Sequence, residues 1–131
     1  MAGVKDFFTS LYHSFGHAFR GWWHVIRTQK NAWLHAITTT LVVALAFWLQ
    51  VSAQDWAVLV LTIALVWSAE FFNTAIEAVV DLASPAQHPL AKTGKDVGAA
   101  AVLIAALAAI LVGLLILGPP LWAKIAPYFI D

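Results

Sequence analysis

Long apolar stretches dominate this chain, and their lengths predict a membrane protein. Apolar residues prevail at 33–51, 56–82 and 96–121, and each stretch is long enough for a membrane-crossing helix of roughly 20 residues. Gly118-Pro119-Pro120 marks the predicted end of the third stretch. Tryptophans lie near the predicted ends, where interfacial aromatic side chains are expected: Trp33, Trp48, Trp56 and Trp122.

The residues before the first span follow a different pattern. Within 5–28, polar residues recur every three or four positions, while aromatic and aliphatic residues fall on the opposite side of the predicted helix. The polar stripe consists of Asp6, Ser10, His13, His17, Arg20, His24 and Arg27. This pattern is typical of an amphipathic helix lying in the membrane surface. The predicted fold is therefore a single all-α membrane domain, 1–131, with three transmembrane helices and an N-terminal amphipathic surface helix.

Composition and charge exclude several other classes. Of the 131 residues, 62% are hydrophobic and 11% charged, and a soluble domain of this size could not bury so much apolar surface. The net charge is zero, so no nucleic-acid partner is expected. The chain has no cysteine, which excludes thiol catalysis and thiolate metal sites.

The basic residues predict the orientation of the chain. Six of the seven lysines and arginines either precede the first span or lie between the second and third spans. Only Lys124 follows the third span. Because basic residues favour the cytoplasmic side, the N-terminus and the Asp81–Lys95 loop are expected in the cytoplasm, and the C-terminus outside.

Four polar residues on the second span need an explanation. Glu70, Asn73, Glu77 and Asp81 are spaced three, four and four apart, which places them on one helix face. Glu70 lies roughly 21 Å along the helix from Trp56, inside a bilayer core about 30 Å thick. A carboxylate at that depth must face the protein interior or a wet cavity. It could hold helices together, but a whole polar stripe favours a functional site.

Other polar groups are expected at the same membrane level. Lys95 and Asp96 begin the third span, while Gln29, Asn31 and His35 flank the start of the first. Carboxylates for Mg²⁺, a lysine for phosphate and a buried glutamate for a proton are the parts of a phosphoryl-transfer site. A proton-coupled transporter would also need an intramembrane glutamate, so both interpretations stay open.

Two segments resemble a known family. The sequence EFFNTAIEAVVDL at 70–82, followed by HPLAKTGKDVGAAAVL at 88–103, is similar to the signature of the prokaryotic diacylglycerol kinase family, which includes undecaprenol kinases. The resemblance covers about 15–117. It implies a homotrimer in the bacterial inner membrane, with active sites shared between neighbouring subunits. It also implies Mg²⁺ and ATP, and a lipid alcohol that is phosphorylated.

The resemblance also implies roles for individual residues. Glu70 matches the catalytic carboxylate and Glu77 a metal-binding carboxylate, while the positions that line the nucleotide and lipid site are Asn73, Asp81, Lys95 and Asp96. Gln29 stands where many members have a metal-binding acid, which leaves an amide oxygen as a weaker ligand. Trp33 replaces a basic residue. The Asn31…His35 pattern is closer to the undecaprenol-kinase-like branch, so both residues are added to the expected substrate site.

Three functions are therefore compared. The first is a lipid kinase that transfers phosphate from ATP to diacylglycerol or undecaprenol at the cytoplasmic interface. The second is a proton- or ion-coupled transport subunit that uses Glu70. The third is a catalytically reduced homologue that only binds lipid, which the residues at positions 29 and 33 motivate.

Overall fold

The computed structural model describes residues 2–84, 86 and 88–129, and this part of the chain is helical with no strand. Its helices are α1 (Ala2–Thr28), α2 (Lys30–Leu49), α3 (Ala53–Ala83) and α4 (Pro89–Ile125), followed by the short 3₁₀ helix η1 (Ala126–Tyr128). Helices α2 and α3, and α4 together with η1, are long and apolar enough to cross a membrane. The predicted all-α fold, with three such helices and an N-terminal helix, is confirmed.

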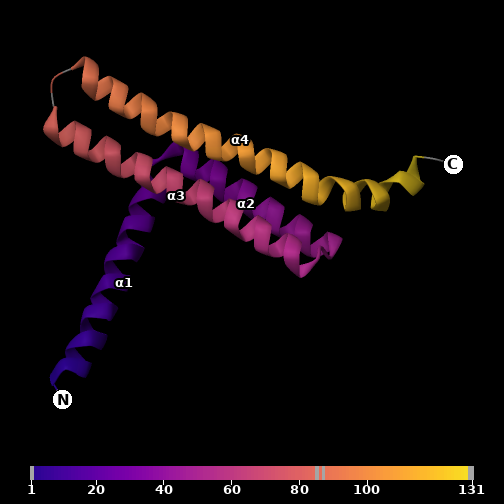
Figure 1. The fold of residues 1–131 in the computed structure, drawn as a ribbon, viewed down its shortest axis with the longest axis horizontal. Helices are drawn as coiled ribbons and strands as arrows, with labels where there is room; N and C mark the ends of the chain where they lie inside the picture. Colours follow the sequence, from indigo (N-terminus) through magenta and orange to yellow (C-terminus); the bar gives the residue numbers. More distant parts are fainter. Residues whose placement is uncertain (1, 85, 87, 130–131) are drawn as a thin grey trace.

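Three helices form a bundle, and the fourth leaves it. Helices α2, α3 and α4 lie side by side, with the most extensive packing between α3 and α4, whereas α1 projects steeply away from them (Figure 1). Nearly all described side chains of α1 are exposed or half-buried, and Val25 is the one that is buried. This angle is the one that a helix lying along a membrane surface requires when its neighbours cross the membrane.

The turn between α2 and α3 is short and well capped. Gln50 adopts the left-handed conformation, with φ 54° and ψ 47°, and its N–H reaches the carbonyls of Ala46 and Phe47. Ser52 then caps α3: its hydroxyl accepts a hydrogen bond from the Asp55 N–H at 3.1 Å, and the Asp55 carboxylate accepts one from the Ser52 N–H at 3.2 Å. This reciprocal pair is a capping box, which satisfies two amide groups that the helix itself leaves free.

The end of the bundle near this turn is held by apolar packing and one long-range polar contact. Ala46, Leu59 and Leu117 bring α2, α3 and α4 together in a buried cluster. Close by, the Lys124 ammonium donates a hydrogen bond of 2.9 Å to the Trp48 carbonyl and lies 4.4 Å from the centre of the Trp48 ring. The last turn of α4 is thereby tied to the end of α2.

Helix α4 extends beyond the predicted third span at both ends. It begins at Pro89, where the His88 imidazole caps it by accepting a hydrogen bond of 3.2 Å from the Leu90 N–H. At the other end it runs through Pro119 and Pro120 to Ile125, so the expectation that these prolines end the helix is wrong. Prolines remove two backbone hydrogen bonds, but membrane helices tolerate this when neighbouring groups compensate.

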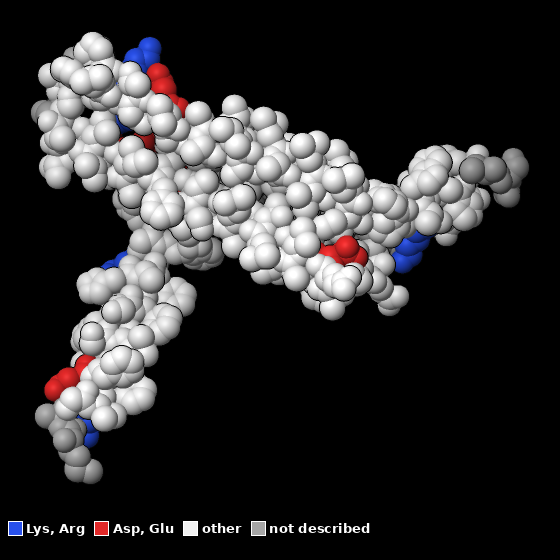
Figure 2. All heavy atoms as spheres, viewed as in Figure 1, with Lys and Arg blue, Asp and Glu red and all other residues white. Residues whose placement is uncertain are grey.

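Charged side chains gather at the extremities of the molecule. In Figure 2 they appear at the α3–α4 loop, along α1 and near the opposite end of the bundle, while the middle of the bundle shows none on this face. Large apolar side chains are exposed along all three bundle helices, including Leu41, Leu61 and Leu115. An apolar belt between two polar ends matches the profile of a bilayer.

Candidate active site

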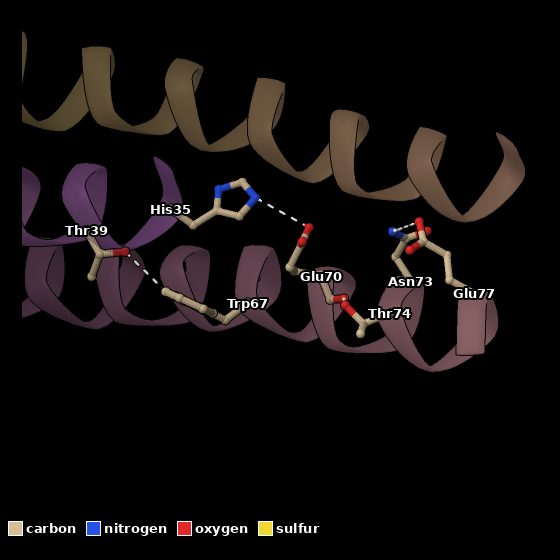
Figure 3. A network of polar contacts seen from close by, with 7 residues as sticks. All are labelled: His35, Thr39, Trp67, Glu70, Asn73, Thr74 and Glu77. Atoms are coloured by element: carbon tan, nitrogen blue, oxygen red, sulfur yellow. Dashed lines mark hydrogen bonds and ion pairs between the residues drawn. The ribbon is translucent and has the colours of Figure 1, made fainter. Parts of the chain in front are cut away.

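The Glu70 carboxylate lies inside the bundle and faces α2. Its side chain is only 1% exposed, and its Oε2 lies 3.6 Å from Nε2 of His35. Figure 3 shows the two side chains pointing toward each other. Within the described residues, neither Glu70 oxygen nor His35 Nε2 has a hydrogen-bond partner at normal distance. Leaving a buried polar group unpaired costs about 1–3 kcal/mol, so a helix-pairing role alone accounts poorly for this pair. The arrangement is suited to receiving a polar group from a ligand.

About two turns further along α3, Glu77 is contacted by two amide side chains. Its Oε1 accepts a hydrogen bond of 3.0 Å from Asn73 Nδ2, and its Oε2 accepts one of 3.4 Å from Gln29 Nε2. Gln29 directly precedes α2, so this contact joins residues 48 positions apart in the sequence. The sequence-based grouping of Gln29 with the second-span stripe therefore corresponds to a direct contact.

The last residue of the stripe, Asp81, lies closer to water. Asp81 forms an ion pair of 2.5 Å with Lys95 of α4, and both side chains are more than a third exposed. Beside them lies an open pocket of about 760 Å³ between the end of α3 and the start of α4. Asp96 also lines this pocket. Burial thus decreases steadily from Glu70 to Asp81 along one face of α3.

Not every expected residue joins this cluster. Asn31 is exposed on the first turn of α2, and in the described part of the chain it makes no hydrogen bond to the other expected site residues.

Three residues near the site were not predicted from the sequence. Thr74 donates a hydrogen bond of 2.9 Å to the Glu70 carbonyl, and both His88 and Lys92 line the loop pocket. Proline at the first position of a helix is a known helix-start signal, so Pro89 could have indicated that His88 caps α4 beside the pocket.

The residues around Glu77 have the chemistry that Mg²⁺ requires. Mg²⁺ is usually bound by one or two carboxylates together with substrate phosphates and water. Glu77 supplies one carboxylate, the two amides beside it carry oxygens, and Asn73 Oδ1 is buried without a hydrogen-bond partner among the described residues. Across residues 2–84, 86 and 88–129, no three His, Cys, Asp or Glu side chains form a metal cluster. The residues fit a cation that a nucleotide helps to hold.

Known proteins are similar to this chain over most of its length. The profile of the family described as "Prokaryotic diacylglycerol kinase" matches residues 16–117. The chain belongs to this family. It is 41% identical to the undecaprenol kinase of Bacillus subtilis over 111 residues, which cover 85% of this chain and 90% of that protein.

Two diacylglycerol kinases are also similar. The protein from Synechocystis is 44% identical over 113 residues, which cover 86% of this chain but only 65% of that protein. The protein from Escherichia coli strain K12 is 33% identical over 118 residues, covering 85% of this chain and 91% of that protein. Family membership and the three membrane-length helices make this chain a membrane lipid kinase. Among the functions compared above, the transport subunit is thereby disfavoured.

Proposed function

We propose that the chain transfers the γ-phosphate of ATP to the hydroxyl of diacylglycerol or undecaprenol, at the cytoplasmic face of a bacterial inner membrane. The observation that carries this proposal is the Glu70 carboxylate, which is 1% exposed and faces His35. A buried carboxylate beside an imidazole, with a second carboxylate suited to Mg²⁺ about two turns further along the same helix, provides for proton transfer and phosphate binding in one site.

Glu70 has a specific task in this reaction. A lipid hydroxyl is too weak an acid to ionise before it reacts, so its proton must leave as the bond to phosphorus forms. The lipid oxygen bonds to the γ-phosphorus, and the bond from that phosphorus to the β–γ bridging oxygen breaks. The electron pair of that bond leaves with ADP, while Glu70 accepts the lipid proton. His35, at 3.6 Å, is placed to support Glu70 and to orient the hydroxyl.

The loop pocket is suited to the nucleotide. It offers Lys92, Lys95 and His88 at the wet end of the site, where a water-soluble substrate can enter. Lys95 is paired with Asp81, so an incoming phosphate would compete with that carboxylate for the ammonium group. An exposed ion pair of this kind contributes about 0–1 kcal/mol, so replacing Asp81 by a phosphate at Lys95 requires little free energy.

Glu77, Gln29 and Asn73 would hold Mg²⁺ together with the phosphates. When bound, the ion neutralises phosphate charge and so stabilises the transferring group. The chain's own contribution is to present one carboxylate between two amide side chains. Because Gln29 is uncharged, this site would offer Mg²⁺ one carboxylate in place of the two that a glutamate at position 29 would provide.

Orientation and assembly are parts of the same proposal. We place the N-terminus and the α3–α4 loop in the cytoplasm, which the distribution of basic residues supports. A homotrimer would let a neighbouring subunit bring Asn31, exposed in the single chain, close to a site.

Cysteine labelling tests the orientation. In intact cells, a cysteine at position 86 (Ala86→Cys) should not react with a membrane-impermeant maleimide, whereas one at position 128 (Tyr128→Cys) should react. The reverse pattern would contradict the orientation. Mass measurement in detergent tests the trimer.

The activity itself is tested by direct transfer. The purified chain in liposomes is given radiolabelled ATP and either diacylglycerol or undecaprenol, and labelled lipid is measured. Label in one or both lipids supports the proposal and names the substrate. No label in any lipid, with ATP binding intact, would instead support the catalytically reduced homologue.

A further inference from the structure

Trp67 lies where three helices meet, one turn before Glu70 on α3. Its indole Nε1 donates a hydrogen bond of 3.2 Å to Thr39 Oγ1 of α2. Its ring centre lies 6.2 Å from that of His35, also on α2, and 6.0 Å from that of Trp22 on α1. Figure 3 shows the Thr39–Trp67 pair beside the His35–Glu70 pair. This one side chain therefore contacts both α1 and α2 next to the site.

The position of the His35 imidazole depends on these contacts. His35 Nε2 has no hydrogen-bond partner among the described residues, so a hydrogen bond does not fix the orientation of that edge of the ring. Trp67 instead packs against the imidazole with an interplanar angle of 66°, an edge-to-face geometry that aromatic rings favour. The Thr39 hydrogen bond restrains the indole in turn. A restrained indole leaves His35 little freedom to rotate away from Glu70.

We infer that Trp67 is a positioning residue, which holds His35 against Glu70 and links this pair to α1 through Trp22. The inference rests on the proposed function, in which Glu70 accepts the lipid proton. Proton transfer requires donor and acceptor within hydrogen-bond reach, so a displaced imidazole would lower turnover. The Trp22 contact also makes the seating of α1 on the bundle part of the support of the site.

A purely structural role for Trp67 would have different effects, and the chain offers a matched control. Trp56 of α3 packs on Phe47 of α2 near the other end of the same two helices, with the two ring centres 4.7 Å apart. Trp56→Leu therefore removes a comparable aromatic contact between α2 and α3, far from Glu70. Both Trp67→Leu and Trp56→Leu should lower thermal stability in detergent.

Turnover separates the two roles. At saturating ATP and lipid, Trp67→Leu should lower kcat about 10- to 100-fold, with the KM for ATP changed less than about twofold. Trp56→Leu should leave kcat close to that of the unchanged chain. Thr39→Val, which removes the acceptor for the indole, should give a smaller loss in the same direction. Equal kcat values for Trp67→Leu and Trp56→Leu would overturn the inference.

A double-mutant cycle gives a second, independent measurement. If Trp67 acts through the imidazole, Trp67→Leu should change kcat little once His35→Ala is present, because the two changes remove one interaction. Fully additive losses would contradict the positioning role. Trp67→Phe can replace Trp67→Leu in the cycle if the larger truncation fails to fold. If Glu70→Gln alone kept normal turnover, the proton-accepting role of Glu70 would fail, and this inference with it. An inactive Glu70→Gln with a normal Trp67→Leu would reject only this inference, and the absence of labelled lipid with the unchanged chain would reject the proposed function itself.

Discussion

Gly98 of α4 lies directly against the side chain of Asn73 on α3, so closely that a Cβ at position 98 would collide with Asn73 Oδ1. The same Asn73 donates its amide hydrogen bond to Glu77 at 3.0 Å. The absence of a side chain at Gly98 therefore lets α4 approach the residue that orients the proposed metal carboxylate. Small residues commonly permit such close approaches between membrane helices.

Gly98→Ala should consequently disturb the site as well as the packing. The added methyl group must displace Asn73, and overpacking of this kind typically costs about 1–3 kcal/mol. We expect a higher Mg²⁺ concentration for half-maximal lipid phosphorylation, together with a lower melting temperature. Gly94→Ala is the control, because its Cβ would meet only Val80 Cγ2, at an ordinary 3.7 Å. Equal Mg²⁺ requirements in the two variants would show that Asn73 does not transmit the change to Glu77.

Glu70 and Glu77 should be separable by substitution. Glu70→Gln removes the proton acceptor but preserves side-chain volume, so transfer should fall about 10²- to 10⁴-fold while nucleotide binding persists. Glu77→Gln should instead weaken nucleotide affinity and raise the Mg²⁺ requirement together. Equilibrium binding of a fluorescent ATP analogue, measured beside turnover, distinguishes the two variants. Near-normal turnover of Glu70→Gln would favour a helix-pairing role for that residue.

Gln29→Glu should strengthen metal binding. The Gln29 amide lies 3.4 Å from Glu77 Oε2, so a carboxylate here would stand beside a second one. Two adjacent acids attract Mg²⁺ more strongly than one acid and an amide. The Mg²⁺ concentration for half-maximal rate should fall, whereas Gln54→Glu, on an exposed turn at the start of α3, should leave it unchanged. An unaltered requirement in Gln29→Glu would remove Gln29 from the proposed metal site.

Lys124 should contribute to stability and not to catalysis. Its ammonium group holds the Trp48 carbonyl and ring at the end of the bundle opposite the α3–α4 loop. Lys124→Met keeps the apolar stem and removes the hydrogen bond and the cation–π contact, a loss of about 0.5–1.5 kcal/mol. Thermal unfolding in detergent should shift downward while kcat stays the same. Lys5→Met, on the exposed start of α1, serves as the control; a matching shift there would argue against the tether.

The part of this site that lies on one helix could be predicted from the sequence. The three- and four-residue spacing from Glu70 to Asp81 is set by helix periodicity alone, and the structure shows the expected common face. Contacts across helices could not be derived in the same way. The ion pair between Asp81 and Lys95, and the collision that limits position 98, depend on how α3 and α4 are rotated about their axes.

Trp67 illustrates the same limit. In the sequence it is one more tryptophan in an apolar stretch, three residues before Glu70. Only the packing of α1, α2 and α3 reveals that it touches Trp22 and His35 together. The prolines inside α4 show a related dependence on packing. Their effect on a helix depends on neighbouring groups that local sequence does not specify.

The depth of Glu70 determines which concentration the reaction responds to. Glu70 is enclosed by helices, whereas the loop pocket is open. In the proposed mechanism, a lipid alcohol would therefore reach Glu70 by lateral diffusion within the bilayer, while ATP would arrive from water. The relevant measure for the lipid is then its mole fraction in the membrane, and for ATP its molarity. Adding inert phospholipid at constant total substrate should slow the reaction, whereas adding buffer at constant ATP concentration should not.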